Sequence, residues 1–481
     1  MHIAFLNPQG NFDRKDSFLT EHPDFGGQLV YVKETCLALA RQGVQVDIVT
    51  RRIDDPDWPR FSEQTGYYTD DSSGPRIVRI DSGGSAFLRK EHLWPHLEEF
   101  VENILVFYGK DLPDAFTAHY ADGGYCAALL RQRTGRSFTF TAHSLGAQKL
   151  DKLGMQLSNA GEMEEEFHFS ERIAAERLAM QTAARIITST SQERLKQYAH
   201  PLYQGAVDVK DDTRFSVIPP GVNTRVFTTT ATAADAQQHV AIADRCGDTD
   251  SPYIVCSSRL DEKKNILGIV RAYAGSCELQ EMARLGLFIR GITDPFSEIG
   301  NLPAAEQAVL QPILDTISEA AIRSRVDFFD IRSQQALAAS YRYFAVRGSV
   351  FALTAYYEPF GLAPIEAAAC GLAIVATRNG GPVEIFADGS GLLVDPFDDQ
   401  DIARGLHEAL LRQQELAQLG IRRVRSTYTW DRTAELYRSV LESMIVSDVT
   451  AGVVIPELGN RSRIRDYLAA RDAVHATQSA S

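Results

Sequence analysis

Short apolar runs alternate with helical patterns along almost the whole chain. The runs have the length of strands, and the segments between them repeat apolar residues at the spacing of an α-helix. This alternation is typical of parallel sheets covered by helices, so it predicts an α/β protein. The expected strands are Ile3–Leu6, Val44–Thr50, Ile77–Ile80, Ala115–Ala118, Phe138–Thr141, Ile186–Ser189, Phe215–Ile218, Tyr253–Ser258, Leu287–Arg290, Val326–Phe329, Ser349–Thr354, Ile374–Thr377 and Leu392–Asp395.

The alternation is interrupted once, near the middle of the chain. Two prolines and a glycine lie in Ile218–Val222, and a loose polar stretch follows from Thr228 to Asp250. We therefore expect two doubly wound, Rossmann-like domains, residues 1–225 and 226–429, with ligands bound where the carboxyl ends of their strands face each other across a cleft. Trp430–Met444 has helical spacing, and residues 447–481 form a polar tail in which we expect partial disorder.

Composition limits the partners of this protein. The hydrophobic fraction of 44% over 481 residues supports full cores. With 49 basic and 63 acidic residues the net charge is −14, which argues against nucleic acid or an anionic membrane as a partner. A site for a phosphorylated ligand must therefore be a local basic pocket in an acidic protein.

Other composition signals predict a cytoplasmic protein without a metal. The six cysteines are scattered and lack metal-ligand spacing, which indicates reduced thiols. We see neither a signal-peptide core nor an apolar stretch of membrane-spanning length. Asp-x-Asp occurs at Asp55–Asp57 and Asp248–Asp250, but both stretches look like loops and lie away from the motifs described next.

The run from Glu358 to Gly371 carries the clearest chemistry. Glu358 is expected in a loop after a strand, and Glu366 about one turn into the following helix, on the side that faces the loop. Gly361 lets the backbone approach a ligand, and the helix end attracts phosphate through the unpaired amides of Leu362 and Ala363. Such a site would receive a nucleotide sugar. The alternative is a buried pair of carboxylates that caps a helix.

Two cations follow an expected core strand. Arg259 and Lys264 are separated by a short loop, so both can converge on one diphosphate and neutralise the charge that develops when a sugar–phosphate bond breaks. The alternative is a solvated cluster of charges.

Two further motifs carry weaker signals. Gly26 and Gly27 open a helix and could let backbone approach a phosphate or a sugar, although a double glycine is more often a turn. The dinucleotide fingerprint GxGxxG is absent, which excludes a nicotinamide-dependent oxidoreductase. His143 ends a strand, where a packed histidine is more common than a catalytic one.

Several long phrases resemble sucrose-phosphate synthases, and the resemblance runs from residue 1 to about 445. The Glu358–Glu366 and Arg259–Lys264 spacings also look like the donor motifs of retaining glycosyltransferases of family 4. On this sequence we expect the short form of the enzyme, without a regulatory extension or an appended phosphatase domain. The phrases are Asn7–Gly10, Thr20–Glu34, Ala142–Lys149, Ser189–Glu193, Val217–Asn223 and Arg378–Glu384.

The resemblance implies a GT-B fold, with a helix at about residues 430–446 that crosses back to the first domain. It implies glucose transfer from UDP-glucose to fructose 6-phosphate, giving sucrose 6-phosphate and UDP with retention at the anomeric carbon. No protein nucleophile, metal or cofactor is implied; the departing β-phosphate oxygen would take the acceptor's proton. A separate sucrose-phosphate phosphatase is a candidate partner.

Roles for individual residues also follow from the resemblance. The implied catalytic residues are His143, Glu358, Arg259 and Lys264. Donor contacts are implied for Gly27, Arg259, Lys264, Glu358, Phe360, Gly361, Leu362, Ala363 and Glu366. Acceptor contacts are implied for Gly27, Gln28, Lys90, Tyr120, Ser144, Lys149 and Arg172, with the three cations holding the phosphate.

Three alternatives remain open at this point. A sister enzyme could use another donor, such as GDP-mannose, as mannosylfructose-phosphate synthase does. A sucrose synthase would use free fructose. A non-catalytic regulator that binds sugar nucleotides is disfavoured, because Arg259, Lys264, Glu358 and Glu366 are all present.

Overall fold

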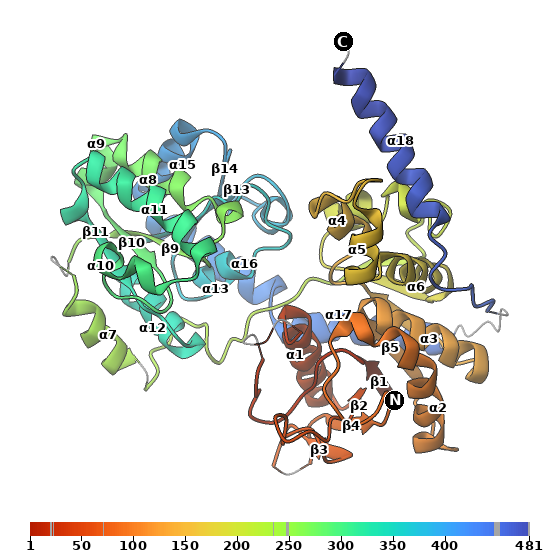
Figure 1. Ribbon diagram of the computed structural model, residues 1–481. Helices are drawn as coiled ribbons and strands as arrows, with labels where there is room; N and C mark the ends of the chain where they lie inside the picture. The colour runs from red at the N-terminus through yellow and green to blue at the C-terminus, as the bar shows by residue number, and fades with distance from the viewer. Residues whose placement is uncertain are drawn as a thin grey trace. The chain divides into compact units, whose positions relative to one another are not determined.

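The computed structural model of the chain contains two α/β units (Figure 1). It describes residues 1–19, 22, 24–70, 72–233, 235–246, 250–446 and 453–479. Unit 1 comprises Met1–Pro219 and Thr433–Ser481, and unit 2 comprises Pro220–Arg432. The prediction of two Rossmann-like, parallel-sheet domains is confirmed.

Unit 1 is built on an eight-stranded sheet of order β3-β4-β2-β1-β5-β6-β7-β8. All neighbouring strands are parallel except β3, which runs antiparallel to β4. The strands are β1 (His2–Leu6), β2 (Gln45–Arg51), β3 (Thr65–Tyr67), β4 (Arg76–Ile80), β5 (Ala115–His119), β6 (Phe138–Thr141), β7 (Arg185–Thr188) and β8 (Phe215–Val217). The helices are α1 (Gly27–Arg41), α2 (Leu97–Tyr108), α3 (Tyr120–Thr134), α4 (Gly146–Lys152), α5 (Ala160–Phe167), α6 (Phe169–Thr182), α17 (Trp430–Val446) and α18 (Ser462–Ser479).

The central strand β1 shows why the sheet strands read as apolar runs. Ala4 and Leu6 are buried in one core with residues of α2, α3 and α6. Phe5, on the other face, lies against Tyr437 of α17, with 5.9 Å between the ring centroids. Both faces of the strand are therefore buried, which removes the alternation seen in half-exposed strands.

Unit 2 is built on a six-stranded parallel sheet of order β11-β10-β9-β12-β13-β14. The strands are β9 (Tyr253–Ser257), β10 (Arg284–Phe288), β11 (Val326–Phe329), β12 (Val350–Leu353), β13 (Ala373–Thr377) and β14 (Leu392–Val394). The helices are α7 (Asp235–Ala243), α8 (Ile266–Ala274), α9 (Cys277–Met282), α10 (Pro295–Glu298), α11 (Ala304–Glu319), α12 (Gln334–Ala345), α13 (Leu362–Ala369), α14 (Pro382–Ile385), α15 (Asp399–Leu411) and α16 (Gln413–Thr427).

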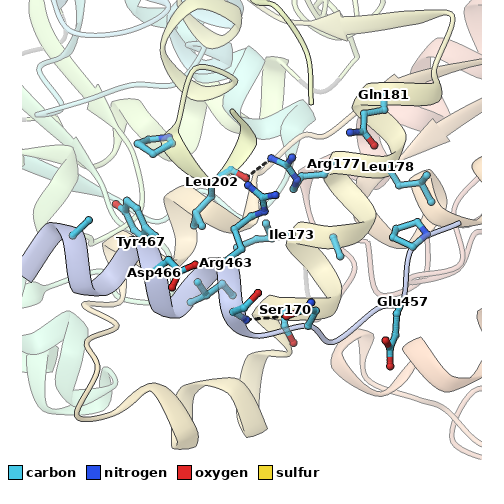
Figure 2. Close-up of a pocket in the computed structure, with 17 residues that line it drawn as sticks. Ser170, Ile173, Arg177, Leu178, Gln181, Leu202, Glu457, Arg463, Asp466 and Tyr467 are labelled. Carbon is cyan, nitrogen blue, oxygen red and sulfur yellow. Dashed lines mark hydrogen bonds between the residues drawn. The ribbon is translucent and has the colours of Figure 1, made fainter. Parts of the chain in front are cut away.

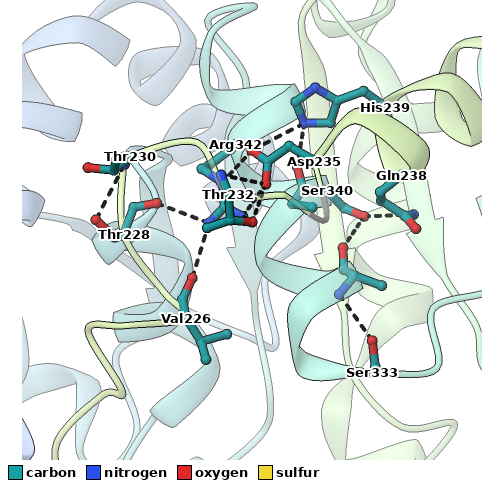
Figure 3. A network of polar contacts seen from close by, with 12 residues as sticks. Val226, Thr228, Thr230, Thr232, Asp235, Gln238, His239, Ser333, Ser340 and Arg342 are labelled. Atoms are coloured by element: carbon teal, nitrogen blue, oxygen red, sulfur yellow. Dashed lines mark hydrogen bonds and ion pairs between the residues drawn. The ribbon is translucent and has the colours of Figure 1, made fainter.

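The polar stretch Thr228–Asp250 is more ordered than its composition suggested, because it contains α7. Figure 3 shows the contacts that hold it. The Arg342 guanidinium of α12 contacts both carboxylate oxygens of Asp235, at 2.6 and 2.7 Å, and donates to the carbonyls of Val226 and Thr228. The hydrogen bonds from Arg342 hold the pKa of Asp235 well below its usual range. One buried ion pair thus ties the start of unit 2 to its core.

The C-terminal segment also differs from the expected polar tail. Residues 447–452, 480 and 481 lie outside the described residues, but α18 occupies most of the remainder. Ile464 and Leu468 of α18 are buried in the core of unit 1. The polar composition predicted partial disorder in this segment, whereas a helix there packs on unit 1 through two buried apolar side chains.

Candidate functional site

The loop after β12 gives Glu358 a defined position. Gly361 has φ of +116°, a conformation that favours glycine, and precedes the first residue of α13. The loop Asn379–Gly381 packs directly on this backbone: the Glu358 N–H donates to Asn379 O at 3.0 Å, and the Gly381 N–H donates to Glu358 O at 2.9 Å. A Cβ on Gly380 would lie 2.0 Å from Glu358 O, so a side chain there would displace the loop. The double glycine of Arg378–Glu384 therefore holds Glu358 in place.

Lys264 lies beside Glu358. Its ammonium is 2.7 Å from Glu358 Oε2, although the two residues are far apart in the sequence. Asn265 fixes the turn that carries Lys264, because its side-chain amide donates to Thr354 O and Pro396 O while its oxygen caps α8. Asn265 directly follows Lys264 in the sequence, but no sequence pattern indicated that it fixes this turn.

Arg259 differs from Lys264 in its surroundings. Its side chain is exposed at the end of β9, and no ion-pair partner is found for it among the residues that the structure describes. Of the two cations predicted to contact the diphosphate, Lys264 therefore has an ion-pair partner, whereas Arg259 has none among the described residues.

Glu366 lies in α13, which has no side-chain cap at its N-terminus. Burial raises the pKa of Glu366 to about 8. Within the described part of the chain its carboxyl has no hydrogen-bond partner, so the helix-cap alternative is not what the structure shows. Phe360 packs into the core of unit 2 against Tyr428, while Leu362 is exposed at the start of the helix.

The predicted phosphate contacts come together in one pocket of unit 1. Arg172 is 4% exposed and forms a 3.0 Å ion pair with Glu176, and its guanidinium stacks 4.5 Å from the Tyr120 ring centroid. Lys90 makes a short contact with the carboxylate of Asp24. The residues that line the pocket are Lys90, Glu91, Trp94, Tyr120, Asp122, Lys149, Phe167 and Arg172.

Lys149 is the least neutralised cation of this pocket. Its ammonium lies 4.4 Å from the centroid of the Phe167 ring, and it has no ion-pair partner among the described residues. Burial, and then the charge of Arg172, lower the pKa of Lys149. The negative charge of an anion in the pocket would oppose both effects and stabilise the charged ammonium.

The remaining acceptor candidates do not line this pocket. The carbonyl oxygen of Ser144 accepts a 2.7 Å hydrogen bond from Arg172, which places it next to the pocket. The buried amide nitrogen of Gln28 has no hydrogen-bond partner among the residues that the structure describes. Neither Gly26 nor Gly27 has a positive φ, and a Cβ on either would meet no atom within 4 Å. Neither a tight turn nor close packing therefore requires the double glycine, and backbone access for a ligand stays a prediction.

His143 is linked to a second histidine that the sequence reasoning missed. His143 has φ of +57°, and its Nε2 lies 2.8 Å from Nδ1 of His119, whose own Nε2 lies 3.1 Å from the Thr117 hydroxyl. Burial lowers the pKa of His143 to about 3, and burial together with His143 lowers that of His119. Both imidazoles are therefore neutral, and each can only donate through one nitrogen.

A larger cavity, of about 610 Å³, lies between α6, the turn Pro201–Tyr203 and the C-terminal segment of unit 1. Figure 2 shows the Arg177 and Arg463 guanidinium groups side by side in it, with Arg177 donating to Leu202 O at 2.7 Å. None of the predicted site residues lines this cavity.

The described residues contain neither a cluster of metal ligands nor a helix suited to cross a membrane. No group of three or more His, Cys, Asp and Glu side chains is placed there to hold a metal ion. Asp55 and Asp57 lie in an exposed turn, and Asp248 falls outside the described residues.

Among the residues that the structure describes, no helix combines the length and apolar character that a membrane crossing needs. All six cysteines are free.

Comparison with known proteins identifies the family. The family described as "Sucrose synthase first GT-B domain" matches residues 1–244, and "Glycosyl transferases group 1" matches residues 244–423. A protein of Thermosipho melanesiensis named probable sucrose-phosphate synthase is 42% identical over 464 residues, which are 95% of this chain and 98% of that protein. The chain belongs to the sucrose-phosphate synthase family. It is therefore a GT-B glycosyltransferase, and the predicted family and fold class are confirmed.

Other members of the family are longer. A sucrose-phosphate synthase of Zea mays is 32% identical over 507 residues, which are 91% of this chain but 46% of that protein. The chain thus spans about half the length of the plant relatives that it matches. The solved sucrose-phosphate synthase of Thermosynechococcus elongatus matches with a TM-score of 0.63 and 24% identity, covering 92% of this chain and 99% of that one, which supports the shared fold.

Proposed function

We propose that this enzyme transfers glucose from UDP-glucose to fructose 6-phosphate, giving sucrose 6-phosphate and UDP. The observation that carries the proposal is the pocket of unit 1, where Lys90, Lys149 and Arg172 gather in a protein of net charge −14. Three cations from separate elements have a common purpose if a phosphate dianion binds among them. A free sugar would not need them.

Unit 2 would hold the donor. The proposal assigns Arg259 and Lys264 to the diphosphate, Glu358 to the glucose hydroxyls and Glu366 to the ribose hydroxyls. Lys264 supports this assignment, because its ammonium already holds Glu358 at 2.7 Å and can also oppose the charge that develops on the departing phosphate. Glu366 supports it as well, because its side chain is half-buried and its carboxyl has no hydrogen-bond partner among the described residues.

The proposed reaction retains the configuration at the anomeric carbon without a protein nucleophile. The bond from the anomeric carbon to the β-phosphate oxygen breaks, the acceptor hydroxyl attacks the same face, and its proton passes to that phosphate oxygen. The protein then contributes position and charge stabilisation. In this proposal no metal or other cofactor takes part, so activity should persist when EDTA is added to the assay. Sucrose 6-phosphate would be a substrate for a separate phosphatase.

A donor–acceptor matrix tests the proposal. UDP-glucose, ADP-glucose and GDP-mannose are each combined with fructose and with fructose 6-phosphate, and the released nucleotide is measured. The expected best pair is UDP-glucose with fructose 6-phosphate. A preference for GDP-mannose would make the chain a mannosyltransferase, and equal use of free fructose would make it a sucrose synthase.

A variant pair then tests the phosphate pocket. Loss of one charge-assisted contact costs about 1.5–3 kcal/mol, so Lys149→Ala should lower kcat/KM for fructose 6-phosphate roughly 10- to 100-fold. Activity with free fructose should change little. Lys152→Ala is the matched control, because Lys152 lies on the same helix, is exposed and does not line the pocket.

A further inference from the structure

Asp122 places in the unit 1 pocket a carboxylate oxygen that no described residue of the protein contacts by a hydrogen bond. It lies in the first turn of α3 and lines the pocket together with Lys90, Lys149 and Arg172. The residue is 3% exposed, and Oδ1 accepts a 2.8 Å hydrogen bond from the Gly123 N–H. Oδ2 is buried and has no hydrogen-bond partner in the part of the chain that the structure describes. A buried oxygen without a partner is costly unless a ligand engages it.

The surrounding backbone keeps Asp122 in this position. A Cβ on Gly123 would lie 2.7 Å from the carbonyl oxygen of Leu6 on β1, and one on Gly124 would lie 2.9 Å from Ala179 on α6. The start of α3 therefore packs directly against the sheet and the neighbouring helix. The backbone of Asp122 therefore cannot move away from the pocket without a shift of α3.

Several charged or titratable groups face Asp122, but none forms an ion pair with it. The ammonium of Lys90 contacts Asp24 and lies 3.5 Å from Glu91, and the guanidinium of Arg172 pairs with Glu176. Burial raises the pKa of Asp122 to about 7, against smaller opposing effects of the Gly123 N–H, Arg172 and Lys90. The facing groups are Lys90 and Glu91 before α2, Tyr120 and Cys126 on α3, Lys149 on α4 and Arg172 on α6.

We propose that Asp122 recognises the acceptor in its protonated form, donating a hydrogen bond from Oδ2 to the phosphate group. This inference rests on the proposed function, because the acceptor phosphate supplies the oxygen that accepts the bond. A dianion next to an ionised carboxylate would be repelled, so binding draws one proton from solvent onto Asp122. The residue thus makes phosphate binding depend on pH.

The sign of this dependence follows from the linkage. When pH rises above about 7, free Asp122 loses its proton and the apparent affinity for fructose 6-phosphate falls. The second ionisation of the phosphate, near pH 6, acts in the opposite direction, because the dianion becomes more abundant. A KM that increases from pH 6.5 to pH 8.5 therefore reports a group on the protein.

Asp122→Asn is the decisive variant, since asparagine keeps the size and an N–H donor at every pH. With saturating UDP-glucose, KM for fructose 6-phosphate should increase roughly 10-fold or more between pH 6.5 and 8.5 in the wild type. In Asp122→Asn it should increase less than about 3-fold. Asp111→Asn, an exposed position, should behave as the wild type. The same pH dependence in wild type and Asp122→Asn would overturn the proposal.

A calorimetric measurement gives a second readout that does not depend on enzyme kinetics. Fructose 6-phosphate is titrated at pH 7.5 in two buffers with different ionisation heats, which yields the number of protons bound per ligand. We expect uptake of more than about half a proton. No uptake would overturn the proposal, and so would uptake that persists in Asp122→Asn, because the proton would then belong to another group such as Lys149.

The two proposals fail differently. A wild-type enzyme without preference for fructose 6-phosphate over fructose contradicts the proposed function. A clear preference combined with a pH dependence that Asp122→Asn leaves unchanged contradicts only the role of Asp122.

Discussion

Lys264 offers the sharpest test of the donor site in unit 2. It ends the short turn Glu262–Lys264, and its ammonium lies 2.7 Å from Glu358 Oε2. Lys264→Met keeps the aliphatic stem and removes the positive charge. The change therefore removes the cation that pairs with Glu358. It also removes one of the two cations that are proposed to contact the diphosphate.

Two losses determine the expected magnitude. A hydrogen bond to a charged group contributes about 1.5–3 kcal/mol, and Glu358 loses one such bond. Removing a group that stabilises developing charge in the transition state costs about 3 kcal/mol or more. If both act in the reaction, the loss is about 4.5–6 kcal/mol, so kcat/KM for the donor should fall roughly 1,500- to 20,000-fold, because each 1.4 kcal/mol is a factor of ten.

The assay is the initial rate of nucleotide release while UDP-glucose is varied at saturating acceptor. Lys263→Met is the matched control, since Lys263 is an exposed neighbour on the same turn that makes no side-chain ion pair among the described residues. Thermal melting of both variants separates loss of fold from loss of function. If Lys264→Met stays within about threefold of Lys263→Met, the reasoning from the Lys264–Glu358 pair is wrong.

Three further predictions concern buried ionisable groups. Arg172→Ala leaves the fully buried Glu176 unpaired, so the free energy of unfolding should drop by about 3–5 kcal/mol, measured by urea denaturation; an unchanged midpoint would contradict this. Arg342→Leu should have a comparable effect because Asp235 loses its partner, and adding Asp235→Leu should restore part of it in the same assay. The pKa of Glu366 is about 8 in the folded state, above its value in the unfolded chain. As pH rises from about 4.5 to 8, the wild type should therefore lose stability relative to Glu366→Gln, on the order of 1 kcal/mol per pH unit. Parallel curves of Tm against pH for the two proteins would refute this.

Strand positions show how far local pattern reaches. Each of the expected strands overlaps a strand of the structure, but β10 begins at Arg284, three residues before the expected Leu287. The first residue of β10, Arg284, pairs with Asp327 of the neighbouring β11 at 2.7 Å, a contact between two strands that no local pattern records. The edge strand β3 was missed because Thr65–Tyr67 is short and largely exposed and so carries no apolar run.

The functional residues show a similar division. The motifs around Glu358 and Lys264 could be read directly, because each follows a strand of a parallel sheet, where such sheets bind ligands. Lys149 was predicted only from the family resemblance. Asp122 carried a comparable signal, a carboxylate just after the buried strand β5, but nothing local says that its Oδ2 lacks a partner. The Asn379–Gly381 loop was recognised as a phrase, while its role in holding Glu358 required the contact itself.

The sequence by itself determined the α/β class, the division into two parallel-sheet domains and the motifs that carry charge. Apolar spacing and turn residues act over a few neighbouring positions, so a linear pattern records them. Only the tertiary structure decided which positive charges are neutralised by a carboxylate. Three of the predicted site cations have such a partner: Lys90 pairs with Asp24, Arg172 with Glu176 and Lys264 with Glu358. The ammonium of Lys149 instead lies over the aromatic ring of Phe167. Ion pairing and desolvation depend on distances of a few ångströms between segments far apart in the chain, and those distances exist only once the chain has folded.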